Sequence, residues 1–194
     1  MSAPGEFLSP RPLAGEGPGE RAAVRIHAED PSRLLEAAFR RIQAETMADV
    51  PILNPALQVE AVGFTRWQGH WLGIVITPWF MNLVLVPGAE DTWQSVAPGL
   101  RLFRNFPSGD FAFLGSDEIE VGEFQSCSLF SPMGQFADQG GAREVALAAL
   151  EALQAEPVAG TPAPGKDAFE DPKQAALERP MSKREFLGSV FRRS

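Results

Sequence analysis

The chain has 194 residues, of which 44% are apolar, and its formal net charge at pH 7 is −8. This negative charge repels a nucleic-acid backbone, so the composition argues against nucleic acid as a partner. A single cysteine excludes an internal disulfide bond, and with two distant histidines it provides no metal-ligand spacing, so neither a metal nor another cofactor is predicted.

Residues 1–21 are rich in proline and glycine and lack both the basic start and the apolar run of a secretory signal. We expect them to form a disordered leader. A single cysteine and no secretory signal suit the reducing cytoplasm, which is the predicted location. Residues 22–154 have the length and composition of one domain with its own core.

The first predicted element is a helix in the segment "DPSRLLEAAFRRIQAETM", residues 30–47. The carboxylate of Asp30 can accept hydrogen bonds from the amides of a first helical turn, and Pro31 has no amide hydrogen to leave unbonded there. Apolar side chains recur at helical spacing along one side of the segment, and they are Leu34, Leu35, Ala38, Phe39 and Ile42. This stripe predicts that the helix packs against a sheet.

Six later segments have the composition of strands, and they are residues 59–67, 71–77, 83–86, 102–106, 111–114 and 124–130. Their connections hold turn-forming residues such as Gln68, Gly69 and Pro107 and leave no room for crossover helices, so neighbouring strands are predicted to be antiparallel, as in a meander. The longest apolar stretch, residues 71–86, is broken by a proline and an asparagine. It is too short to span a bilayer, which argues against stable membrane insertion.

A final helix is predicted from about Ser131 to Leu153, with a kink at Gly140 and Gly141. Together these elements predict an α+β fold, a two-layer sandwich of a mainly antiparallel sheet with N- and C-terminal helices. Residues 155–180 are rich in alanine, proline, glycine and charge, and they predict a flexible linker.

Aromatic residues and a methionine crowd the segment "WQGHWLGIVITPWFMN", at positions Trp67, Trp71, Trp79, Phe80 and Met81. Core packing can absorb the first two tryptophans. A Pro-Trp-Phe-Met turn is harder to bury, and exposed aromatic and methionine side chains anchor protein interfaces. We therefore predict that these five residues contribute to a contact surface for a peptide or protein.

Carboxylates gather between positions 110 and 123, at Asp110, Asp117, Glu118, Glu120 and Glu123. One interpretation is a solvated sheet edge that prevents pairing with other molecules. Another is a binding edge for a basic peptide, because each arginine fork can take a carboxylate bidentately. Under the second interpretation, Asp110, Glu120 and Glu123 are the candidate binding residues.

Cys127 is the candidate for a catalytic nucleophile, with His70 as a possible base. Cys127 lies in the middle of a predicted strand, where a small apolar side chain is normally buried, and the sequence lacks the known hydrolase, metalloprotease and phosphate-binding motifs. We therefore predict that the protein is not an enzyme. A small thiol-dependent enzyme remains the alternative from another functional class.

Four segments carry a resemblance to a known family: "NPALQVEAVGF", "WQGHWLGIVITPWFMNLVLVP", "FPSGDFAFLG" and "GEFQSCSLFSPMGQFADQ". In these segments, which cover most of residues 54–139, the chain resembles the HybE-type assembly chaperones of [NiFe]-hydrogenases. Residues 1–21 and 155–180 show no such pattern. The tail at residues 181–194 is a departure from a minimal family member.

The resemblance implies a secretion-chaperone-like fold and a non-enzymatic cytoplasmic helper. It implies binding of the small and large hydrogenase subunit precursors, including the small subunit with its twin-arginine signal, before export. Other maturation proteins are further possible partners, in which case the chain would serve as a scaffold.

The tail, "MSKREFLGSVFRRS" at residues 181–194, is basic and amphipathic. Ser182, Lys183, Arg184, Phe186 and Leu187 resemble the twin-arginine pattern S-R-R-x-F-L of export signals, although here the pattern stands late in the chain. The hypothesis is that the tail imitates the client's signal and occupies the groove that binds this signal when no client is present.

Overall fold

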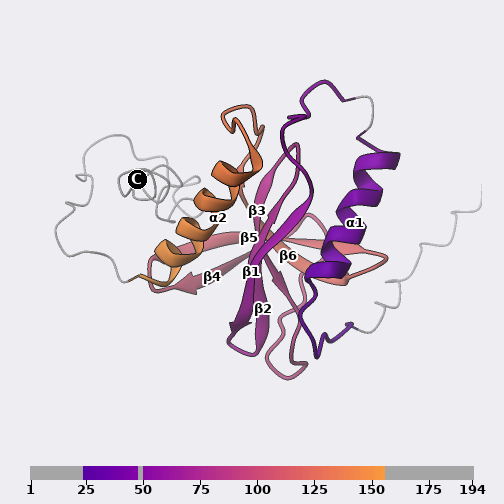
Figure 1. Ribbon diagram of the computed structural model, residues 1–194. Helices are drawn as coiled ribbons and strands as arrows, with labels where there is room; N and C mark the ends of the chain where they lie inside the picture. The colour runs from indigo at the N-terminus through magenta and orange to yellow at the C-terminus, as the bar shows by residue number, and fades with distance from the viewer. Residues whose placement is uncertain (1–23, 48–49, 156–194) are drawn as a thin grey trace, which may run out of the picture.

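The computed structural model describes residues 24–47 and 50–155 (Figure 1). The predictions for the leader at 1–21 and the tail at 181–194, and for the linker beyond residue 155, lie outside the described residues.

A single antiparallel sheet organises the domain, and its strands are β1 (Glu60–Trp67), β2 (His70–Ile76), β3 (Met81–Val86), β4 (Arg101–Phe106), β5 (Gly109–Glu118) and β6 (Gly122–Phe130). Their order is β1-β2-β3-β6-β5-β4. The predicted α+β class with a mainly antiparallel sheet is confirmed. The predicted simple meander is wrong after β3, because the long connection over residues 87–100 lets β6 pair with β3 and leaves β4 at the edge.

Tight turns set the register of the hairpins. At the β1–β2 turn, Gln68 and Gly69 have φ angles of 49° and 84°, as two-residue hairpin turns of this handedness require. Between β2 and β3, the Thr77 amide donates to the Phe80 carbonyl at 2.8 Å, and the Thr77 hydroxyl oxygen accepts from the Phe80 amide at 2.9 Å. The turn thus satisfies its own polar groups and can be buried.

Helix α1 (Ser32–Glu45) begins after Pro31, and the carboxylate of Asp30 accepts a hydrogen bond from the Ser32 amide at 2.8 Å. Helix α2 (Gln139–Gln154) begins eight residues later than predicted. Its N-cap, Asp138, accepts from the amide of Gly141 at 2.8 Å. The predicted kink is therefore wrong, because the two glycines lie in the first turn of α2.

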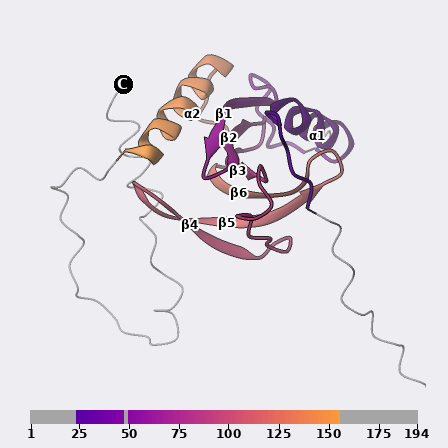
Figure 2. The same cartoon turned by 90° about the horizontal axis from the view of Figure 1, so that it is seen from below.

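The two helices lie on opposite faces of the sheet (Figures 1 and 2). Because alternate side chains of a strand point to opposite faces, the same strand can contribute to both cores. In β2, Leu72, Ile74 and Ile76 pack in the core that contains α2, whereas Val75 packs in the core that contains α1. The α1 core comprises Leu35, Ala38, Phe39, Val59, Phe64, Val75, Trp79, Val84, Val86, Val121 and Phe124.

Candidate functional site

The predicted exposure of the aromatic turn is wrong. Trp79 is only 8% exposed and Met81 is fully buried, while Phe80 is half-buried. The rings of Phe80 and Phe39 meet edge to face at 5.3 Å, so α1 covers the turn. The turn therefore belongs to the core, and binding by Trp79 and Met81 would need the core to open.

Trp67 and Trp71 are half-buried and support the sheet. The Trp67 ring stacks on Phe106 with centroids 4.4 Å apart. The indole N–H of Trp71 donates to the His27 carbonyl at 2.9 Å, and the Arg66 guanidinium lies 4.2 Å from the centre of its ring. These contacts fix the segment before α1 to the first two strands.

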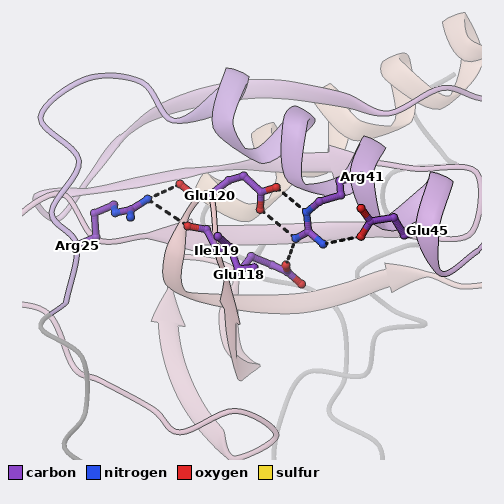
Figure 3. A network of polar contacts seen from close by, with 6 residues as sticks. All are labelled: Arg25, Arg41, Glu45, Glu118, Ile119 and Glu120. Carbon is purple, nitrogen blue, oxygen red and sulfur yellow. Dashed lines mark hydrogen bonds and ion pairs between the residues drawn. The ribbon is translucent and has the colours of Figure 1, made fainter.

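Glu120 is engaged by Arg41 of α1 (Figure 3). The Arg41 guanidinium donates to both carboxylate oxygens of Glu120, at 2.6 and 3.0 Å, and to Glu118 at 2.7 Å and Glu45 at 3.3 Å. The hydrogen bond from Arg41 is the main cause that lowers the pKa of Glu120, and the hydrogen bond to Glu120 is the main cause that raises the pKa of Arg41. The group clamps α1 to the β5–β6 turn, so Glu120 is not available to a peptide in this conformation.

Replacing Arg41 by glutamine should lower the thermal unfolding midpoint at pH 7 modestly, since partly exposed ion pairs contribute little. The pKa of Glu120 is lowered in the folded state, so its stabilisation is present above the ordinary value of 4.5 and is lost as the pH falls through the folded-state pKa. The difference between the two proteins should therefore shrink below about pH 4.5. Thermal unfolding followed by circular dichroism from pH 7 to pH 3 measures this; a constant difference would contradict the clamp.

Glu123 is also used internally. Its carboxylate accepts from the amide of Val96 at 2.8 Å and from the indole N–H of Trp93 at 3.3 Å. It thereby holds the 87–100 loop against the sheet beside Gly115, where an added Cβ would lie 2.2 Å from the Val96 carbonyl oxygen. Of the three predicted carboxylates, only Asp110 is exposed, and it accepts from the Asn105 side-chain amide at 2.8 Å.

Cys127 and His70 are both buried. Cys127 lies opposite Leu83 in the core that contains α2. The Gly88 amide donates to His70 Nδ1 at 3.3 Å, and burial is the main cause that lowers the pKa of His70. Neither side chain is presented to a substrate, and the described part of the chain contains no group of histidine, cysteine and acidic residues that could hold a metal ion.

Sequence reasoning missed an exposed apolar surface on β4 and β5. Phe103 is 50% exposed and Leu114 is 39% exposed, and they are diagonal neighbours because Phe103 pairs with Ala112 and Arg101 with Leu114. We call this surface the open face, and it consists of Arg101, Phe103, Asn105, Asp110, Ala112 and Leu114. The sequence signal in these strands pointed the other way. The segments "LRLF" and "FAFL" carry apolar residues on both faces, a pattern that favours burial of both faces rather than exposure of one.

The open face continues the side of the sheet that carries α1. Leu114 lies opposite Ser126, and Ser126 lies opposite Val84, which packs in the α1 core. Helix α1 packs on Phe124 of β6, whose ring lies 6.3 Å from that of Phe39, and it contacts β5 at the last residue of that strand, where Arg41 pairs with Glu118. Figure 2 shows that neither helix of the described residues lies on the outer side of β4 and β5.

The opposite side of β4 and β5 is buried and contains one cation. The Arg104 guanidinium donates twice to the Gln125 side-chain oxygen, at 3.1 and 3.0 Å, and lies over the Trp93 ring. Burial lowers the pKa of Arg104. An inward-pointing charge in an edge strand limits uncontrolled pairing with other strands. Because Arg104 points to the buried side of the sheet, it does not cover the open face.

The open face adjoins a regular sheet edge. Strand β4 is the edge strand at one side of the sheet, and it pairs with β5 without a register shift from Arg101 to Phe106. The other edge strand, β1, is interrupted between Val62 and Thr65 by a register shift at Gly63, whose φ is 66°. The β4 edge is therefore the better template for another extended segment.

The described residues thus form a small α+β domain with exposed apolar side chains on the sheet face next to an edge strand. The family model described as "[NiFe]-hydrogenase assembly, chaperone, HybE" matches residues 30–189, so the chain belongs to this family of hydrogenase assembly chaperones. The structure also resembles the solution structure of HybE from Escherichia coli, with a TM-score of 0.58 and 26% identity, over 75% of this chain and 91% of that one.

Two relatives illustrate the match. Protein HoxT of Cupriavidus necator is 44% identical over 153 residues, which cover 71% of this chain and 85% of that protein. The probable rubredoxin HupJ of Rhodobacter capsulatus is 42% identical over 123 residues, which cover 63% of this chain but only 44% of that longer protein. The predicted family is thus confirmed, and the family match extends to residue 189.

Within the described residues, no helix has both the length and the apolar character needed to cross a membrane.

Proposed function

We propose that this chaperone acts in the cytoplasm by holding precursors of [NiFe]-hydrogenase subunits, without catalysing a reaction. The clients are the large subunit and the small subunit with its twin-arginine signal peptide. Membership of the assembly-chaperone family supports hydrogenase subunits as partners. The buried positions of Cys127 and His70 favour binding over thiol chemistry.

The observation that carries the proposal is the open face beside the regular edge of β4. An extended client segment adds to an exposed edge through backbone hydrogen bonds, and alternate side chains find apolar contacts on the sheet. Phe103 and Leu114 supply those contacts. The predicted surface at Trp67, Trp71, Trp79, Phe80 and Met81 is replaced by this one, because those five residues are buried or half-buried.

Charge gives the bound segment a direction. The end of the open face near the β4–β5 turn carries Asp110, and the other end carries Arg101. A guanidinium fork can take the Asp110 carboxylate bidentately, whereas Arg101 repels a second cation. The basic pair of a signal peptide would therefore lie toward the turn, with its apolar part over Phe103.

Calorimetric titration with the small subunit's signal peptide tests the proposal. The peptide should bind, and a matched peptide with both arginines replaced by glutamine should bind more weakly. The Cys127→Ala variant should bind the peptide with unchanged affinity, because the proposed binding does not use the thiol. A thiol-dependent enzyme, in contrast, would lose its function with the sulfur. If neither peptide binds, and other maturation proteins co-purify instead of either subunit precursor, the chain is a scaffold and the proposal is wrong.

A further inference from the structure

We propose that residues 181–194 of this same chain dock on the open face and shield it when no client is bound. The proposal rests on the proposed function, because it has residues 181–194 and the client bind the same surface. It goes beyond the hypothesis made from the sequence, which left the position of the groove open, because it assigns the segment to β4 and β5.

The route of the chain favours this occupant. Near the end of α2, the Leu153 carbonyl accepts hydrogen bonds from the amide and the hydroxyl of Ser108, at 3.4 and 2.9 Å. The chain therefore leaves the described domain beside the turn that joins β4 to β5. A coil of the length of residues 156–180 spans about 25–30 Å, which exceeds the roughly 20 Å length of β4.

The chemistry of the segment complements the face. At helical spacing, the apolar residues of the segment form one stripe that consists of Phe186, Leu187, Val190 and Phe191. The segment carries four basic residues and one acidic residue, a net charge of +3, which leaves −11 for the rest of the chain's total of −8. Its apolar stripe can contact Phe103 and Leu114, and one of its two basic pairs, at residues 183–184 or 192–193, can lie at the Asp110 end.

The family match extends to residue 189, well beyond the end of α2, so the family pattern includes most of this segment.

Docking should be weak and easily displaced. An isolated helix of this length is marginal in water, and Gly188 costs about 1 kcal/mol relative to alanine. A tether of this length gives an effective concentration on the order of millimolar, so a millimolar affinity would leave the open face about half covered. A client would then bind about twofold more weakly than to a chain without the segment.

Nuclear magnetic resonance of the full chain and of a chain ending at residue 180 tests the docking. Amide resonances of residues 100–116 should shift when the segment is removed, whereas those of β1 should not. Adding a synthetic peptide of residues 181–194 to the shortened chain, at millimolar concentration, should move the same resonances back. A full-chain variant with Phe186→Ser and Phe191→Ser should resemble the shortened chain.

The outcomes separate this proposal from the proposed function. Absence of shifts at residues 100–116 overturns the docking, whatever the client affinity. Shifts at the open face, together with a client affinity about twofold higher after removal, support docking and a shared surface. Shifts without any change in client affinity support docking but show that the client binds elsewhere, so the shared surface is wrong.

Discussion

We expect Phe103→Ser to weaken binding of the hydrogenase small-subunit precursor by at least tenfold. Phe103 is half exposed in the middle of the open face, and buried aromatic anchors at the centre of an interface typically contribute 2 kcal/mol or more. The same exposure means that little core packing is lost, so the stability of the domain should change by less than about 1 kcal/mol. Calorimetric titration and denaturant unfolding measure the two effects separately.

The matched control for Phe103→Ser is Ile119→Ser. Ile119 is also apolar and is 83% exposed, but it lies in the turn between β5 and β6, away from the open face. This control should bind the precursor as the unmodified chain does. Equal loss in both variants would indicate a general effect of surface polarity, and equal binding in all three proteins would place the client on another surface.

We expect Met81→Ala to lower the free energy of unfolding by about 2–5 kcal/mol, the usual cost of removing a fully buried methionine side chain. Met81 is fully buried in the α2 core, beside Ile76 and Phe130 in neighbouring strands. Urea unfolding followed by fluorescence measures the loss. Client affinity, measured where the variant is still folded, should be unchanged.

Leu147→Ala serves as the matched control for Met81→Ala, because Leu147 lies on the exposed side of α2. It should cost well under half as much as Met81→Ala, since little buried area is lost. If the Met81→Ala protein is stable but no longer binds its client, the aromatic turn at residues 78–81 is a contact surface. That result would contradict the placement of the turn in the core.

Residue patterns identified most of the secondary structure. The stripe from Leu34 to Ile42 and the apolar strand segments are local signals, and the structure places helix and strands close to the predicted ranges, although Leu34 itself is exposed. Errors arose where two local signals competed. Ser131-Pro132 resembled a helix start, but the chain turns there and the helix begins only after the Asp138 cap.

The candidate site was less predictable, because exposure depends on what packs over a segment. Trp79 lies in a turn, which favours exposure, yet α1 and the core close over it. Glu120 and Glu123 belong to an acidic cluster, yet Arg41 and the 87–100 loop use their carboxylates. In each case the partner is distant in sequence, so no local pattern indicates it.

The sequence by itself determined the fold class, the strands, the family and the excess of negative charge, because these follow from local periodicity, composition and recognisable segments. Only the tertiary structure decided that β6 pairs with β3, that β4 becomes an edge strand, and that α1 contacts β5 only through Glu118 at its end, away from the open face. Strand order is set by which long-range pairings bury the most apolar surface, and that sum cannot be read from any one segment. The exposure of Phe103 and Leu114 is a consequence of that order.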